Sequence, residues 1–336
     1  MTILDKFKRP IRDLRISVID KCNFRCPYCM PAEIFGADYN FLHNSELLSN
    51  EELIRLARLF AQVGVSKLRI TGGEPLIRPE LVELIEAWVQ IPGIEDVAMT
   101  TNGYYLRQHA QALYDAGLHR LTVSLDALDD ETFQILNGRK STVARVLDGI
   151  AAAQEAGFTN IKINCVVKKG VNEHAVLELA RRFKGTDIIV RYIEYMDVGN
   201  LNGWKMDDVV TAAEIREMIN AEMPLEAIAP NYVGEVANRF TYKDGAGEVG
   251  IIASVTKPFC GNCTRARVSS AGEYYTCLFA NNGTDLRAPL RDGSSDEEII
   301  GRISGVWRKR DDQYSELRTS FTELPAKGAE MYRLGG

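Results

Sequence analysis

The feature that most constrains the fold is a regular alternation of strand-like and helix-like segments over residues 14–194. Each short apolar segment is followed by a loop or by a segment whose apolar residues recur at helical spacing. The predicted strands are residues 14–19, 65–70, 96–100, 120–125, 160–167 and 188–194. The predicted helices are residues 49–63, 80–90, 106–116, 130–136, 142–155 and 173–183. This order implies a parallel sheet in an α/β fold, and its six units fall short of the eight in a complete barrel. We therefore predict an open, partial (β/α)6 TIM-type barrel.

The alternation breaks near residue 199, which predicts two regions: a barrel over residues 1–199 and a C-terminal region over residues 200–336. The second region has a predicted helix at residues 212–222, followed by irregular chain with short strands. Its tail is polar up to residue 331, and we assign no element there. The chain ends in Gly335-Gly336.

Composition excludes several classes of protein. A net charge of −6 argues against general nucleic-acid binding, although it does not exclude a local basic pocket. No apolar run approaches the roughly 18 residues that span a bilayer. The first twelve residues lack the apolar core of a signal peptide. We therefore expect a cytoplasmic protein whose thiols stay reduced, so that clustered cysteines indicate metal or redox chemistry.

Three of the seven cysteines, Cys22, Cys26 and Cys29, lie within eight residues directly after the first predicted strand. In parallel α/β folds, ligands bind at the C-terminal ends of the strands. The spacing is too tight for a disulfide framework and can hold three corners of an iron–sulfur cube, leaving one iron open. A zinc site with a distant fourth ligand is the alternative.

Polar groups follow the next strands at the same end of the predicted sheet. They are Gly72-Gly73-Glu74 after the second strand, Thr101-Asn102 after the third and Ser124-Leu125-Asp126 at the fourth. The predicted topology therefore brings these groups to the edge that carries the cysteine loop.

A second group, Cys260, Cys263 and Cys277, has no fourth cysteine nearby, and the four histidines of the chain are distant in sequence. An iron–sulfur cluster with one iron open to a substrate nitrogen or oxygen fits better than zinc. Between these cysteines, Arg265 and Arg267 alternate on an extended segment and so point to the same side. Paired guanidinium groups suit a polyphosphate or a carboxylate, whereas a solvated surface pair is the alternative.

The first triad, with the aromatic Tyr28 before its third cysteine, resembles the signature of radical S-adenosylmethionine (SAM) enzymes. Gly72-Gly73-Glu74-Pro75 is similar to their glycine-rich segment, which meets the methionine amino group of SAM. The resemblance implies that SAM chelates the open iron of a [4Fe–4S] cluster. Reductive cleavage then gives methionine and a 5′-deoxyadenosyl radical.

A closer resemblance covers nearly the whole chain. Residues 15–18, 191–199, 234–237 and 255–279, with the closing Gly-Gly, resemble the GTP 3′,8-cyclase family of molybdenum-cofactor biosynthesis. In that family the radical removes the 3′ hydrogen of GTP, and C3′ then bonds to C8 of guanine. The cofactors that it implies are SAM and two [4Fe–4S] clusters.

The resemblance also implies roles for individual residues. The first triad would hold the SAM cluster, and the second triad would hold a cluster that binds the guanine end of GTP. The residues aligned with SAM contacts are Tyr28, Gly73, Ser124 and Met196. Those aligned with GTP contacts are Arg15, Arg69, Thr100, Lys162, Arg191, Arg265 and Arg267, with Lys67 as a further candidate. The Gly335-Gly336 tail would enter the active site and be required for the chemistry.

The partners that the resemblance implies are GTP, an external one-electron donor, the cyclic pyranopterin monophosphate synthase that takes the product, and a second copy of the chain in a homodimer. Cys165, on a predicted strand, is expected to be a buried apolar residue. Two other classes remain open. One is a peptide-modifying radical SAM enzyme with auxiliary clusters, and the other is a zinc-stabilised binding protein without catalysis.

Overall fold

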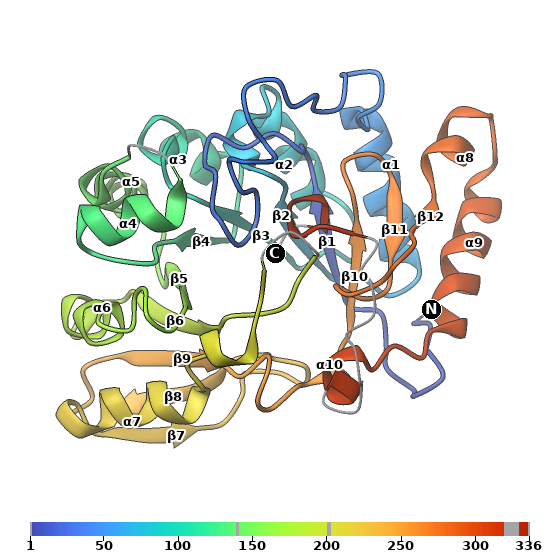
Figure 1. Cartoon of the computed structure of the whole chain (residues 1–336). Helices are drawn as coiled ribbons and strands as arrows, with labels where there is room; N and C mark the ends of the chain where they lie inside the picture. Colours follow the sequence, from blue (N-terminus) through green and yellow to red (C-terminus); the bar gives the residue numbers. More distant parts are fainter. Residues whose placement is uncertain (1, 139–140, 200–202, 319–328, 335–336) are drawn as a thin grey trace.

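The computed structural model describes residues 2–138, 141–199, 203–318 and 329–334. Its centre is a sheet of twelve strands in the order β12-β11-β10-β1-β2-β3-β4-β5-β6-β9-β8-β7 (Figure 1). The six strands predicted from the alternation lie side by side in chain order, and all are parallel. They are β1 (Asp13–Ser17), β2 (Lys67–Thr71), β3 (Asp96–Thr101), β4 (Arg120–Ser124), β5 (Lys162–Val167) and β6 (Ile189–Glu194). The predicted partial barrel is confirmed.

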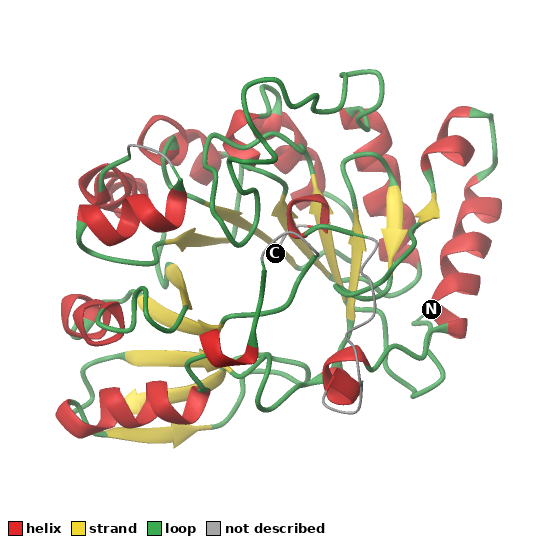
Figure 2. Ribbon diagram, in the orientation of Figure 1, coloured by secondary structure: helices red, strands yellow, loops and turns green. Residues whose placement is uncertain are grey.

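The helices that connect these strands lie on the outside of the curved sheet (Figure 2). They are α1 (Asn50–Gln62), α2 (Leu81–Val89), α3 (Leu106–Asp115), α4 (Asp130–Asn137), α5 (Val143–Ala156) and α6 (Ala175–Phe183). α1 begins with a capping box, in which the Ser49 and Glu52 side chains each accept from the other's backbone N–H. Trp88 of α2 and Phe60 of α1 are fully buried in the layer between helices and sheet. Cys165 on β5 is also fully buried, as expected for an apolar role.

The C-terminal region extends the same sheet at both edges. β9 (Glu248–Ile252) pairs in parallel with β6, and β10 (Arg265–Val268) pairs in parallel with β1. Beyond them, β7 (Leu225–Ile228) and β8 (Asn238–Tyr242) form one antiparallel flank, and β11 (Glu273–Tyr275) and β12 (Thr284–Asp285) form the other. The sheet is therefore continuous across residue 199, and the division there stays a prediction.

Four helices follow or flank these strands: α7 (Ala212–Glu222), α8 (Arg287–Arg291), α9 (Asp296–Lys309) and α10 (Tyr314–Leu317). The sequence predicted α7 but not α9. The prediction missed α9 because the tail is rich in polar residues. α9 has a capping box of Ser295 and Glu298, and it buries Ile299, Ile303 and Trp307 on one face. Within the described residues, no helix combines the length and apolar character needed to cross a membrane.

Candidate active site

The first cysteine loop leaves the C-terminal end of β1 and folds back on itself. The amides of Cys29 and Met30 both donate to the Cys26 carbonyl, at 2.9 and 2.8 Å. The buried Arg25 holds the loop from within, because its guanidinium donates to the carbonyls of Cys22 and Phe24 at 2.7 and 2.8 Å. The three thiols are thereby presented from one short, internally bonded loop.

The Gly72-Gly73-Glu74 segment after β2 packs directly against this loop. A Cβ at Gly73 would lie 2.1 Å from the Lys21 carbonyl oxygen, so only glycine fits there. The amides of Gly73 and Glu74 donate to the carbonyls of Ile19 and Lys21, at 2.7 and 2.9 Å. The motif therefore brings the ends of β1 and β2 into backbone contact beside the thiols.

Glu74 extends this contact to the end of β3. Its buried carboxylate accepts from the Thr101 hydroxyl and the Asn102 amide, both at 2.7 Å, and burial raises its pKa to about 7. The Asn102 side chain in turn donates to the Asn23 side chain at 2.8 Å, within the cysteine loop. The polar groups predicted at the ends of β1, β2 and β3 do meet at one edge of the sheet.

The residues aligned with SAM contacts occupy this edge or the neighbouring cavity. The Tyr28 hydroxyl donates to the Asp126 carboxylate at 2.7 Å, and burial raises the pKa of Asp126 to about 6. Ser124 is the last residue of β4, two residues before Asp126, and Met196 lines the central cavity. Their contacts with SAM remain predictions.

The chemistry of both triads fits a cube better than a single zinc ion. Burial raises the pKa of all three thiols in the first loop, that of Cys22 to about 12. Four sulfurs around one zinc lie about 3.8 Å apart, given Zn–S bonds of about 2.3 Å. In neither triad, all of whose members are described, do the three sulfurs lie within 4.8 Å of one another. This wider spacing suits ligands on separate irons.

The second triad lies at one side of a cavity in the barrel interior. All seven residues aligned with GTP contacts line this cavity together with Cys260, Cys263 and Cys277. The cavity walls also include Asp13, Arg120, Asn164, Tyr232, Glu235, Arg310 and Asp312, which the sequence did not predict. Arg120 and Asn164 could have been found, since Arg120 lies four positions from Ser124, and Asn164 two positions from Lys162, on the same strand face. The loop residues carried no comparable signal.

Strand register accounts for the positive lining. Arg267, Arg15 and Arg69 are neighbours across β10, β1 and β2. Like charges in adjacent positions destabilise a sheet, so this row implies an anion. Burial lowers the pKa of Lys162 to about 8 and of Arg191 to about 9, and neighbouring cations contribute.

Within the described chain, the buried Nε atoms of Arg191, Arg265 and Arg267 have no hydrogen-bond acceptor. The cavity walls therefore combine closely spaced positive side chains with N–H groups that have no hydrogen-bond acceptor. Lys67 is not among the lining residues. It forms ion pairs with Asp13 and Asp96, at 3.8 and 3.4 Å, and its ammonium lies over the Tyr232 ring.

The second triad has a more positive environment than the first. Burial alone would raise the pKa of Cys263, but the charges of Arg265 and Arg310 outweigh it and lower the pKa to about 6. Arg265 also donates to the Cys263 sulfur at 3.4 Å. Burial raises the pKa of Cys277 to about 11. Arg265 thus contacts the triad while also lining the cavity.

The end of the described chain lies between the two cysteine loops. In α11 (Met331–Leu334), Tyr332 packs with Met30 and Phe35 against Cys22 and Cys29. Leu334 packs with Tyr275 near Leu278, which follows Cys277. Gly335 and Gly336 lie outside the described residues, so the predicted insertion of the tail itself stays a prediction.

A three-cysteine loop after the first strand of a partial parallel barrel defines the class of radical SAM enzymes. Residues 16–183 match the family model for the radical SAM superfamily, and residues 188–316 match the model described as Molybdenum Cofactor Synthesis C. The chain belongs to the GTP 3′,8-cyclase family, as the following relatives show.

The chain is 51% identical to the GTP 3′,8-cyclase of Xanthomonas axonopodis pv. citri over 334 residues, which is 99% of this chain and 98% of that protein. It is 50% identical to the GTP 3′,8-cyclase of Staphylococcus haemolyticus over 337 residues, 99% of each chain. Membership excludes the two other classes left open by the sequence.

Among solved structures, Streptococcus suis SuiB bound to S-adenosylmethionine matches with a TM-score of 0.63 and 17% identity. SuiB bound to the precursor peptide SuiA matches with a TM-score of 0.65 and 18% identity. Each match covers 94% of this chain and 69% of the other. At these identities the likeness shows a shared fold alone.

Proposed function

We propose that this chain cyclises GTP to (8S)-3′,8-cyclo-7,8-dihydroguanosine 5′-triphosphate, the first step of molybdenum-cofactor biosynthesis. The observation that carries the proposal is the shared cavity, in which the second cysteine triad and all seven residues aligned with GTP contacts meet. The sequence identity to GTP 3′,8-cyclases supports the same substrate.

The cofactors are two [4Fe–4S] clusters and SAM. Cys22, Cys26 and Cys29 would hold one cluster, and Cys260, Cys263 and Cys277 the other. When bound, the first cluster would supply the electron for the reductive cleavage of SAM, which is the source of the radical needed at C3′ of GTP. The side chains of the cavity bind and orient GTP.

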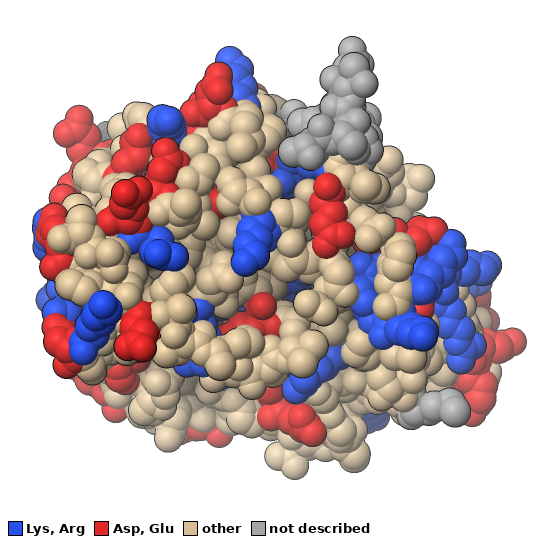
Figure 3. All heavy atoms as spheres, turned by 90° about the horizontal axis from the view of Figure 1, so that it is seen from below, with Lys and Arg blue, Asp and Glu red and all other residues tan. Residues whose placement is uncertain are grey.

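The cations bind and orient the triphosphate. Arg15, Arg69, Lys162, Arg191, Arg265 and Arg267 all line the cavity. The triphosphate carries about four negative charges, which would relieve the repulsion in the arginine row and give the free Nε donors their acceptors. Thr100 adds a hydroxyl, to which Arg69 donates at 3.2 Å. The net charge of −6 is no obstacle, since acidic and basic side chains lie interspersed on the face shown in Figure 3 and the cations of the cavity form a local basic site.

The second triad fixes the other end of the substrate. Its cluster would offer one iron without a cysteine ligand to the guanine base, as a Lewis-acid anchor. Binding at two ends holds the ribose between them, and such positioning is a large part of catalysis. Tyr332 packs near the first cysteine loop and Leu334 packs near the second. Entry of the Gly335-Gly336 tail into the space between the loops is part of the proposal.

The resemblance to the family supports three further parts of the proposal, which are an electron donor, an enzyme that accepts the product and a second copy of the chain. An external one-electron donor reduces the first cluster, and the product passes to the cyclic pyranopterin monophosphate synthase. A second copy of the chain completes a homodimer.

Anaerobic reconstitution tests the proposal. The protein should hold about eight irons with matching sulfide, absorb broadly near 400 nm (roughly, for cysteine-ligated clusters), and consume GTP only with SAM and a reductant. Two zinc ions and no labile sulfide would overturn it. So would turnover of a peptide in place of GTP.

A further inference from the structure

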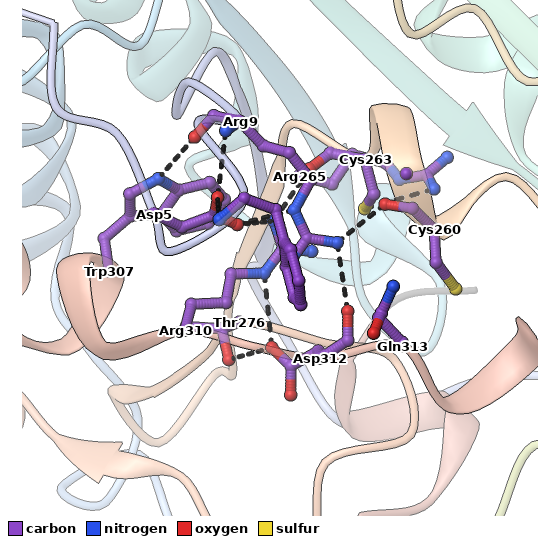
Figure 4. A network of polar contacts seen from close by, with 12 residues as sticks. Asp5, Arg9, Cys260, Cys263, Arg265, Thr276, Trp307, Arg310, Asp312 and Gln313 are labelled. Carbon is purple, nitrogen blue, oxygen red and sulfur yellow. Dashed lines mark hydrogen bonds and ion pairs between the residues drawn. The ribbon is translucent and has the colours of Figure 1, made fainter. Parts of the chain in front are cut away.

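We propose that Asp5, Arg9 and Arg310 form a clamp that positions the second cysteine loop, so that retention of the second cluster depends on them and retention of the first does not. The role of the clamp depends on the proposed function, in which Cys260, Cys263 and Cys277 hold the second cluster. Its members come from the two ends of the chain, the N-terminal segment and the residue after α9 (Figure 4). The three side chains are almost completely buried, at 0–3% exposed.

Arg310 reaches the loop at its C-terminal side. Its Nη1 atom donates to the Cys263 carbonyl at 2.7 Å, and the same atom lies 3.2 Å from the Asp5 carboxylate. Its Nε atom donates to Asp312 at 3.2 Å. The Arg310 guanidinium therefore links the backbone of Cys263 to the carboxylates of Asp5 and Asp312.

Arg9 reaches the loop at its N-terminal side. Its Nη1 atom donates to the Cys260 carbonyl at 2.6 Å and to the Asp312 carbonyl at 3.0 Å. Its Nε atom donates to the Asp5 carboxylate at 2.6 Å. Arg9 thus holds the first residue of the short turn Cys260–Asn262, and Arg310 holds Cys263, the residue that follows the turn.

The third ligand is tied to the same network. The Asp312 carboxylate accepts from the Thr276 hydroxyl at 2.7 Å, and Thr276 directly precedes Cys277. The Arg9 carbonyl accepts from the Trp307 ring nitrogen at 3.1 Å, which joins the clamp to α9. All three cysteines are therefore fixed, through their backbone or a neighbouring group, by one network that is buried at Asp5, Arg9 and Arg310 and partly exposed at Thr276 and Asp312.

Because the three charged side chains of the clamp are buried, loss of one of them should weaken the hold of the others on the second cysteine loop. A buried charge without its partner is costly, so each member depends on the others. Outer groups that orient metal ligands typically change metal affinity by about 10- to 100-fold when removed. Lysine can match the charge of arginine but not its fork of donors. In both arginines Nε donates to a carboxylate while Nη1 donates to a cysteine carbonyl.

The first loop offers a reciprocal control. Arg25 fixes that loop through the carbonyls of Cys22 and Phe24. A second control is Lys6, whose exposed ion pair with Asp311 joins the same two chain segments at 2.6 Å. Its side chain is 55% exposed, so its loss should be silent.

The experiment uses two backgrounds of the full chain. One carries Cys22→Ala, Cys26→Ala and Cys29→Ala, and the other carries Cys260→Ala, Cys263→Ala and Cys277→Ala, so that each retains one cluster. Arg310→Lys, Arg9→Lys, Arg25→Lys and Lys6→Ala are then placed in both. The readouts are iron loss to a chelator, the electron paramagnetic resonance spectrum of the reduced cluster, and circular dichroism as a check of folding.

We expect Arg310→Lys and Arg9→Lys to weaken iron retention by about 10- to 100-fold in the background that keeps the second triad, and to leave the other unchanged. Arg25→Lys should show the reverse pattern, and Lys6→Ala no effect. Equal loss in both backgrounds, loss through unfolding, or no loss in either would overturn the clamp. The result is independent of GTP turnover, so failure of the clamp and failure of the proposed reaction are distinguishable.

Discussion

Arg15 and Arg267 are direct neighbours on the parallel strands β1 and β10, although 252 positions (267 − 15) separate them in the sequence. Arg69 continues the row on β2. Burial lowers the pKa of Arg267 to about 10, and the charge of Arg265 contributes. Repulsion within such a row is destabilising, and a bound anion would relieve it.

The first prediction concerns the positive charge that Arg267 adds to this row. Arg267→Met should raise the dissociation constant of GTP by about 10- to 150-fold, as for the loss of a hydrogen bond to a charged group. The same change should increase the free energy of unfolding of the protein without GTP, since it removes a crowded buried charge. Titration calorimetry and urea unfolding measure the two effects. Lower stability together with unchanged GTP binding would contradict the role given to the row.

The second prediction concerns pH. The folded state lowers the pKa of Lys162 from 10.5 to about 8, so above pH 8 the folded protein holds fewer protons than the unfolded chain. Its contribution to the free energy of unfolding therefore rises between about pH 8 and 10.5. In the proposed role the charged amine binds the triphosphate, so the dissociation constant of GTP should rise by up to about tenfold for each pH unit above 8.

Lys162→Arg provides the control for that pH dependence, because arginine loses its proton at a higher pH than lysine in the same surroundings. GTP binding by the variant should be flatter above pH 8. A wild-type dissociation constant that is flat from pH 7 to pH 9.5 would show that Lys162 does not contact the phosphates.

The third prediction concerns Gly73. A Cβ there would meet the Lys21 carbonyl at 2.1 Å, so Gly73→Ala must displace the first cysteine loop. We expect the variant to lose the first cluster and to keep the second, for a total of about four irons. Gly301→Ala on α9 is the matched control, since its added Cβ would meet nothing within 4 Å. A variant of Gly73 with a full iron content would contradict the close packing of β2 against the loop.

The fourth prediction concerns the tail. Deletion of Gly335 and Gly336 should abolish turnover and leave GTP affinity within about twofold of the full chain, because the cations of the cavity remain. Tyr332 and Leu334, which pack near the two cysteine loops, stay in place in this variant. Single-turnover assays and equilibrium binding separate the two effects. Loss of binding in step with turnover would assign the tail to substrate binding.

Much of the fold could be predicted from local pattern. The six parallel strands and the first cysteine loop follow from apolar periodicity and spacing, and both were confirmed. The pairing of β10 with β1 could not be predicted, because no local signal specifies which distant segment closes an open sheet edge. That pairing creates the arginine row, so Arg15, Arg69 and Arg267 could be named from the resemblance, but their side-by-side arrangement could not be predicted.

Two other features show where sequence pattern fails and why. α9 was missed although its capping box and its buried Ile299 and Trp307 are visible in the sequence, since charged residues dominate its composition. The clamp was missed because Asp5, Arg9 and Arg310 are ordinary charged residues until folding buries them together. Burial of charge is a tertiary property, and periodicity does not report it.

Transfer of a label from substrate to cofactor tests the central claim most directly. GTP deuterated at C3′ is incubated anaerobically with the reconstituted protein, SAM and a reductant, and the 5′-deoxyadenosine is analysed by mass spectrometry. Hydrogen abstraction at C3′ in the cavity predicts one deuterium in the 5′-deoxyadenosine, together with loss of GTP. Unlabelled 5′-deoxyadenosine with intact GTP would contradict it.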